Sequence, residues 1–181
     1  MKSCICVILV DNSNIFIQGQ KHSAKLKDIN GENACDPSWR ISFGKLLNIV
    51  ANKQPILNAI FVGSKPPLND NVWKAAEEQG FKVVVYSRNY DNKEKVVDTK
   101  IVADGVKIIC MSPEPGTLKI LSGDRDFLPL IEVAHEFKWD VEMWAFKNSY
   151  NPHGEMAQAV DKINPLDDYF EDIGMNMYVW P

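Results

Sequence analysis

Two aspartates, Asp124 and Asp126, stand one residue apart in the segment LSGDRDFLPL, directly after an apolar run. Like charges at this spacing cost free energy unless water, hydrogen-bond donors or a cation compensate them. Two interpretations follow. The segment is either a solvated turn whose carboxylate caps the next helix, or one half of a metal site.

Three further aspartates carry the same chemistry. Asp11 directly follows the apolar run CVILV, while Asp98 and Asp104 stand six residues apart in a segment of helical period. Clustered carboxylates that stay ionised favour a hard divalent cation, Mg²⁺ or Mn²⁺. Such an ion activates water and stabilises an in-line displacement at phosphorus, so the pattern favours hydrolysis of a phosphodiester.

Each of these aspartates also has a plain structural explanation. Asp11 and Asp124 stand where helix N-caps are expected, and Asp104 suits a solvated helical position. Six residues rotate a helix by about 600°, which leaves Asp98 and Asp104 about 120° apart. Asp98 is therefore the better candidate for a site at the start of its helix.

Apolar segments that read as strands alternate with segments of helical period. The predicted strands are Cys4–Val10, Ile56–Gly63, Phe81–Ser87, Thr117–Gly123 and Asp140–Phe146. The predicted helices begin at Asn12 and then span about 41–53, 69–80, 96–110, 127–137 and 155–162. This alternation predicts an α/β fold with a mostly parallel sheet of about five strands and helices on both faces.

The predicted fold places the aspartates relative to one another. In open α/β sheets, ligands bind beyond the carboxyl ends of the strands, where the strand order reverses. Asp11 follows the first strand, and Asp124 and Asp126 follow the fourth. We therefore expect these three side chains to face one crevice.

Bulk composition sets the remaining limits. The 181 residues suit one domain, and the net charge of −4 argues mildly against a general polycation that grips nucleic acid. No apolar run approaches the roughly 20 residues that span a bilayer, so we expect no membrane contact. The cysteines lack a CxxC pattern, which favours free thiols in a reducing cytoplasm. The polar insert Lys21–Arg40 is left unassigned.

Three segments resemble the successive motifs of NYN domains, the LabA-like branch of the PIN-like ribonuclease superfamily. They are VILVDNSNIF, KEKVVDTKIVADGVKI and LKILSGDRDFLPLIEVAHEFKWDVEMWAF, and SGDxDF is the most specific element. The resemblance implies a three-layer α/β/α Rossmann-like (PIN-like) fold and a nuclease site that uses Mg²⁺ or Mn²⁺ and acts mainly on RNA. It covers most of a domain at residues 1–165, which leaves 166–181 as a tail packed on the domain or on a partner subunit of a homodimer.

The resemblance also implies roles for individual residues. Matched to the motifs, the catalytic carboxylates are Asp11, Asp98, Asp124 and Asp126. The metal ligands are these four together with Asp104. The residues expected to contact substrate are Asn14, Lys95, Ser122 and Arg125. Val96 stands where the family often has glycine. We expect this difference to alter the path of the loop and to have little effect on metal binding.

Three functions remain open at this point. The first is a metal-dependent ribonuclease, a hydrolase that cuts RNA, with endonucleolytic cleavage expected. The second is a catalytically weak RNA-binding or regulatory protein that keeps the fold. The third is a phosphatase acting on small molecules. Asn12-Ser13-Asn14 after Asp11 offers no DxDx[TV] nucleophile, which argues against an aspartyl-phosphate mechanism.

Overall fold

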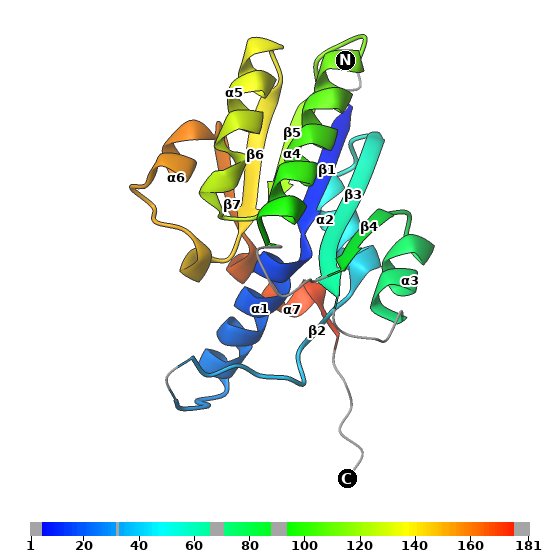
Figure 1. Ribbon diagram of the computed structural model, residues 1–181. Coiled ribbons are helices and arrows are strands. Elements are labelled where there is room, and N and C mark those ends of the chain that lie inside the picture. The colour runs from blue at the N-terminus through cyan, green and yellow to red at the C-terminus, as the bar shows by residue number, and fades with distance from the viewer. Residues whose placement is uncertain (1–4, 32, 66–70, 88–93, 176–181) are drawn as a thin grey trace.

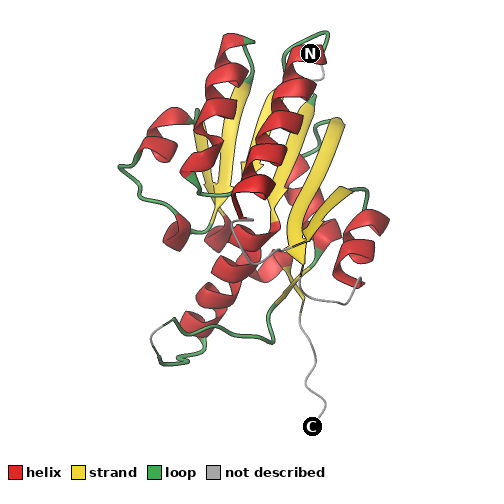
Figure 2. Ribbon diagram, viewed as in Figure 1, coloured by secondary structure: helices red, strands yellow, loops and turns green. Residues whose placement is uncertain are grey.

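A six-stranded parallel sheet forms the centre of the protein (Figures 1 and 2). The structure is a computed structural model that describes residues 5–31, 33–65, 71–87 and 94–175, and of 64–65, 86–87 and 94–98 the backbone alone. Every pair of neighbouring strands in this sheet is parallel. The strands, in spatial order, are β4 (Lys82–Ser87), β3 (Ile56–Lys65), β1 (Cys6–Asp11), β5 (Thr117–Leu121), β6 (Asp140–Ala145) and β7 (Lys162–Pro165).

Helices cover both faces of the sheet, which gives the expected three layers. One face carries α4 (Glu94–Met111), α5 (Leu128–Glu136) and α6 (Glu155–Ala159). The other carries α1 (Asn12–Leu26), α2 (Phe43–Ala51), α3 (Asn71–Glu78) and α7 (Phe170–Ile173). The central strand β1 supplies both cores, because Val7 and Leu9 face one layer and Ile8 and Val10 the other. This alternation explains its continuous apolar run.

Three parts of the chain differ from the sequence-based expectation. Helix α1 continues to Leu26, so the first residues of the insert are helical. The helix expected over 155–162 ends at Ala159, and the chain then forms the edge strand β7. A small antiparallel pair, β2 (Arg40–Ile41) with β8 (Gly174–Met175), joins the end of the insert to the C-terminal segment.

The insert folds back onto α1 around one buried aspartate, Asp36. Its carboxylate accepts hydrogen bonds from Ser23 Oγ and Lys27 Nζ, both at 2.6 Å, and from the Ser38 backbone at 2.9 Å. Burial alone would raise the pKa of Asp36, but these hydrogen bonds outweigh it and hold the pKa well below its usual range. Asp36 therefore stabilises the fold only while it is ionised.

Trp39, just beyond this aspartate, connects the insert to the C-terminal segment. Its ring stacks on Phe170 of α7, with centroids 5.5 Å apart and planes 9° apart. A Cβ on Gly19 would lie 2.3 Å from the same ring, so α1 approaches it closely only because this position is glycine.

The aromatics Tyr178 and Trp180 lie outside the described residues. Within the described part of the chain, no helix combines the length and apolarity needed to cross a bilayer.

A buried lysine, Lys119 of β5, caps the end of α2. Its Nζ donates to the carbonyl oxygen of Val50 at 2.7 Å and lies 3.7 Å from a carboxylate oxygen of Glu142. The last carbonyls of a helix lack partners within it. Lys119 supplies a hydrogen-bond donor to one of these carbonyls, and its own charge stays paired with Glu142.

Replacing Lys119 with alanine should lower the free energy of unfolding by about 3 kcal/mol, because the change leaves Glu142 and the end of α2 without their buried partner. Urea unfolding measures the loss. Lys162 also lies near Glu142, at 3.9 Å, but is 59% exposed, so Lys162→Ala should cost less than about 1 kcal/mol. Equal losses in the two variants would contradict the capping role.

Replacing Asp36 with asparagine should lower the free energy of unfolding by about 2 kcal/mol at pH 7, since hydrogen bonds to a charged group are lost. A carboxyl whose folded-state pKa is depressed stabilises the protein above its unfolded value of about 3.9, and that contribution fades as the pH falls through the folded value. The difference from wild type should therefore narrow below about pH 4. Asp140→Asn, at an exposed position, is the control. Unfolding curves that stay equally separated at all pH values would rule out this account.

Candidate functional site

The strand order reverses next to β1. The chain leaves β1 for β3 and β4 on one side and then returns to β5 on the other, so the crevice expected in such sheets lies between β1 and β5. Val10 pairs with Leu121 across this boundary. Asp11 and Ser122, the residues that follow, are therefore brought to the same point of the carboxyl edge.

A chain of hydrogen bonds joins the two motif segments across this boundary. Ser122 Oγ donates to Asp11 Oδ2 at 3.1 Å, and the Asp124 N–H donates to Ser122 Oγ at 3.2 Å. Ser122 is fully buried, which fixes its hydroxyl between the two aspartates. The structure thus brings together Asp11, Ser122 and Asp124, three residues that the sequence places at the ends of two strands.

The carboxylate of Asp11 is held at an electrostatic cost. Burial raises its pKa above the ordinary value, and the charge of Asp124 adds to this rise. Hydrogen bonds from the Asn14 backbone and the Ser122 hydroxyl oppose it. Among the described residues, no lysine or arginine forms an ion pair with Asp11. The site therefore concentrates negative charge.

Both aspartates are also helix caps, as the plainer interpretation predicted. Asp11 Oδ1 accepts from the Asn14 N–H at 3.2 Å at the start of α1. Asp124 Oδ1 accepts from the Asp126 N–H at 3.1 Å at the start of the short 3₁₀ helix η1 (Arg125–Phe127). Each cap uses one carboxylate oxygen and fixes the side chain, so capping and a role at the crevice are compatible.

The other predicted residues near η1 face solvent. Asp126 is exposed, and its backbone rather than its carboxylate joins the hydrogen-bond chain. Arg125 is 74% exposed and lies 3.6 Å from the equally exposed Glu155 of α6. Such a surface pair contributes little to stability. The guanidinium is therefore free to exchange Glu155 for an anionic ligand.

Asn14, in the first turn of α1, has a buried polar atom without a partner among the described residues. That atom is its side-chain oxygen Oδ1. A buried carbonyl oxygen without a partner costs free energy. This oxygen belongs to the same motif as Asp11, and that cost would be recovered if a donor or a cation bound here.

Helix α4 carries the remaining predicted residues. It follows β4, so it starts at the carboxyl edge, and Asp98 stands in its second turn. The side chains of Lys95 and Asp98 lie outside the described residues. Asp104 lies about 9 Å further along the axis, forms an ion pair with Lys100, and lines a shallow groove of about 340 Å³ with Leu57 and Lys82.

The groove beside Asp104 lies at the amino ends of β3 and β4, away from the crevice between β1 and β5. The structure therefore places Asp104 apart from Asp11 and Asp124, as the 120° rotation on the helix suggested, and its role as a ligand rests on the resemblance alone. Among the described side chains, no three acidic, histidine or cysteine groups meet in a metal-binding arrangement. Asp11 and Asp124 lie at the same edge of the sheet, joined through Ser122, and Asp98 is the candidate for a third carboxylate there.

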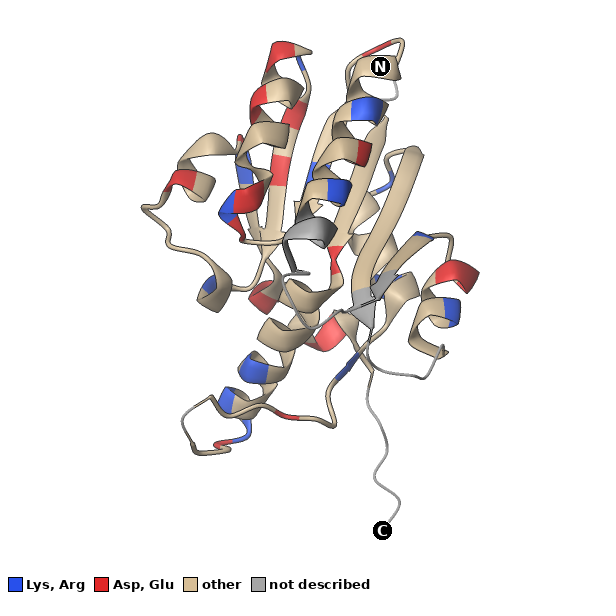
Figure 3. Ribbon diagram, viewed as in Figure 1, with Lys and Arg blue, Asp and Glu red and all other residues tan. Residues whose placement is uncertain are grey.

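Basic and acidic positions are unevenly distributed among the helices that cover the sheet (Figure 3). The exposed or partly exposed Lys21 and Lys25 lie in the second half of α1, and Lys100 of α4 pairs with Asp104. Lys107 of α4 lines the groove at the amino ends of β3 and β4, away from the crevice. Helix α5 instead presents Glu132 and Glu136. Although the whole chain carries a net charge of −4, α1 and α4 therefore carry basic positions along their length.

Gly123 is a structural requirement of this site that the sequence analysis left without a role. A Cβ at this position would lie 2.6 Å from the backbone oxygen of Ser149 and 2.7 Å from its hydroxyl. Ser149 ends the 3₁₀ helix η2 (Lys147–Ser149) that follows β6. The glycine in SGD therefore lets η2 pack directly behind the turn that carries Asp124. Its position between Ser122 and Asp124 is the sequence feature that could have identified this role.

Replacing Gly123 with alanine should lower the free energy of unfolding by about 1–3 kcal/mol, because the new methyl group overlaps with η2. Removing the Ser149 hydroxyl in the same chain should not restore stability, since the backbone oxygen remains. Thermal or urea unfolding of Gly123→Ala, Ser149→Ala and the double variant tests both statements. Wild-type stability in Gly123→Ala would show that η2 is not packed as described.

Comparison with known proteins agrees with the fold and with the family that the motifs resemble. No curated protein matches the chain. Among solved structures, it is similar to a Vibrio parahaemolyticus protein described as of unknown function, with a TM-score of 0.67 at 16% identity, covering 96% of this chain and 97% of that one. At that identity the likeness shows the fold alone. The family model of the NYN domain matches residues 6–167, a span that includes β1, β5 and the whole crevice between them. The chain therefore belongs to the NYN-domain family.

Proposed function

We propose that this protein is a divalent-metal-dependent ribonuclease that hydrolyses RNA phosphodiester bonds at the crevice between β1 and β5. The observation that carries the proposal is the chain of hydrogen bonds from Asp11 through Ser122 to Asp124. It runs from the Asp11 carboxylate to the backbone N–H of Asp124 and so brings the two aspartates to the point where this type of sheet binds ligands. Membership of the NYN-domain family supports the same assignment.

The residues at the crevice suit a hard cation. The available donors are carboxylate, amide and hydroxyl oxygens, the ligand type that Mg²⁺ and Mn²⁺ prefer. Asp11 is desolvated next to the charge of Asp124, and the buried Asn14 Oδ1 has no partner among the described residues. A cation here would relieve both costs. Asp11 and Asp124 would hold it, with Asp98 as the third ligand from α4.

A bound Mg²⁺ or Mn²⁺ supplies Lewis acidity at phosphorus and lowers the pKa of coordinated water. The protein's own residues do the positioning. Ser122 links the Asp11 carboxylate to the Asp124 backbone, and a helix-cap hydrogen bond to Oδ1 holds each carboxylate. Arg125 is placed to contact a phosphate oxygen through its guanidinium.

Neutralising either central aspartate should abolish metal-dependent RNA cleavage. Asp11→Asn and Asp124→Asn keep the size of the side chain and an oxygen that can cap the helix, but remove the charge that holds a cation. We expect kcat/KM to fall by at least about 100-fold in both variants. Cleavage of labelled RNA with Mn²⁺, with Mg²⁺ and with excess chelator measures this.

Controls separate this function from its alternatives. Glu132→Gln on α5 changes an equal charge at an exposed position away from the crevice and should retain full activity. Parallel assays with DNA and with a phosphomonoester test the substrate class. RNA binding without cleavage in the wild type would favour the RNA-binding alternative, and turnover of the phosphomonoester alone would favour a phosphatase. Chelator-resistant cleavage shared by all variants would indicate a contaminating nuclease and would leave the proposal without support.

A further inference from the structure

Asp167, outside the three motifs, joins two elements that support the crevice. It lies in the 3₁₀ helix η3 (Leu166–Tyr169), which follows the edge strand β7. Its Oδ1 lies 3.2 Å from His22 Nδ1 on α1, and its Oδ2 accepts the Lys147 N–H of η2 at 2.8 Å. The side chains of Asp167 and His22 are only 15% and 18% exposed. One largely buried carboxylate therefore contacts α1 with one oxygen and η2 with the other.

The contact with α1 fixes the direction of the helix that Asp11 caps. His22 lies ten residues beyond the first residue of α1, about 15 Å along the axis. Its ring packs against Phe146 and Phe170, with centroids 5.7 and 4.7 Å away. Asp11 holds the start of α1, and Asp167 adds a polar contact at this second point beside the ring packing.

The contact with η2 fixes the wall behind Asp124. Ser149 of η2 lies so close to Gly123 that no side chain fits between them, and its hydroxyl donates to the Phe146 carbonyl at 2.8 Å. Gly123 stands between Ser122, which binds Asp11, and Asp124. At the other end of η2, the backbone N–H of Lys147 donates its hydrogen bond to Asp167.

We propose that Asp167 is a positioning residue that holds the Asp11 and Asp124 carboxylates in register through α1 and η2. It contacts neither carboxylate directly. Its influence on catalysis rests on the proposed function, whereas its influence on the position of the SGD turn does not. We expect its loss to lower activity by about 10–100-fold, because small displacements of reacting groups are costly even when their cause lies far from the chemistry.

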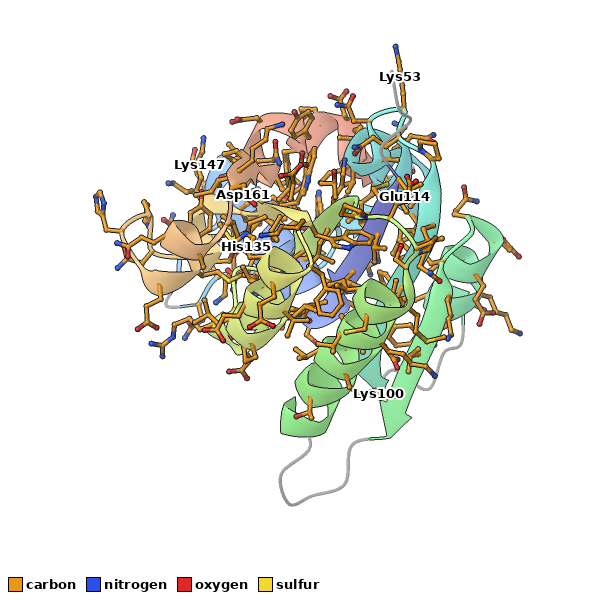
Figure 4. All side chains as sticks on the ribbon, turned by 90° about the horizontal axis from the view of Figure 1, so that it is seen from above. Lys53, Lys100, Glu114, His135, Lys147 and Asp161 are labelled. Carbon is orange, nitrogen blue, oxygen red and sulfur yellow. The ribbon has the colours of Figure 1, made fainter. Side chains whose placement is uncertain are left out.

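The neighbouring Asp168 provides a matched control. It lies in the same 3₁₀ helix, but among the described residues its carboxylate pairs only with the Lys147 side chain, at 3.2 Å, and both partners are more than half exposed. Figure 4 shows Lys147 at the periphery of the molecule. Asp168→Ala removes the same charge one residue away and leaves the His22 and backbone contacts in place.

The test compares Asp167→Ala with Asp168→Ala by two readouts. In ¹H–¹⁵N spectra, the amide signals of Asn14, Gly123 and Asp124 should shift in Asp167→Ala and stay near their wild-type positions in Asp168→Ala. In RNA cleavage, kcat should fall by about 10–100-fold in Asp167→Ala, with KM for RNA within about threefold of wild type because the exposed Arg125 is unchanged. His22→Phe keeps the ring packing and removes one of the two contacts. It should shift the Asn14 signal more than that of Gly123, and it serves as the second variant if Asp167→Ala does not fold.

Unchanged amide signals in Asp167→Ala would overturn the inference, as would shifted signals with full kcat per folded molecule. A lower melting temperature with unchanged kcat would likewise reduce Asp167 to a structural role. Cleavage that persists in Asp11→Asn refutes the proposed function instead. In that case, or if the wild type does not cleave RNA, the amide comparison alone decides whether Asp167 positions the turn.

Discussion

The hydrogen bond from Ser122 to Asp11 is the interaction on which the candidate site depends. It crosses the boundary between β1 and β5, where the strand order reverses, and joins segments 111 residues apart in the chain. The parallel pairing of these strands makes it possible, because Val10 and Leu121 stand opposite each other and the next residue of each strand reaches the edge. A different register would separate Asp11 from the turn that carries Asp124.

The surrounding structure holds this edge in place from both layers of helices. On one face, α1 begins with the Asp11 cap, and the insert closes over it through Asp36 and Trp39. On the other, η1 begins with the Asp124 cap, and Phe127 anchors it in the core at 0% exposure. The opposite, amino edge is tied by local pairs such as His135 with Asp161, at 3.0 Å (Figure 4). Elements of both helical layers therefore hold the carboxyl edge that carries Asp11 and Asp124.

Periodicity predicted the parts of the fold that follow from burial. Continuous apolar runs identify the buried strands β1, β3, β5 and β6 from the sequence alone. The helical period of apolar residues identifies the helices that cover them. Strand β7 was missed because its four residues, KINP, lack a continuous apolar run, being an edge strand with one neighbour. The insert was missed because a single buried charge organises it, and Asp36 resembles any loop aspartate until its partners Ser23 and Lys27 are seen around it.

For the candidate site too, some features could be predicted from the sequence and others could not. Topology predicted that Asp11 and Asp124 reach the same edge, whereas the link through Ser122 and the exposure of Asp126 were seen only in the structure. The separation of Asp104 required the actual direction of α4. Asp167 carries no sequence signal, because its partners come from two other elements. Metal dependence, the LabA-like assignment and a homodimer stay predictions.

The most direct test of the account is an anomalous difference map from crystals soaked in Mn²⁺. The account predicts a peak at the crevice, next to the Asp11 and Asp124 carboxylates, that disappears in Asp11→Asn. A crevice without a peak at saturating Mn²⁺, or a peak that persists unchanged in Asp11→Asn, would contradict it.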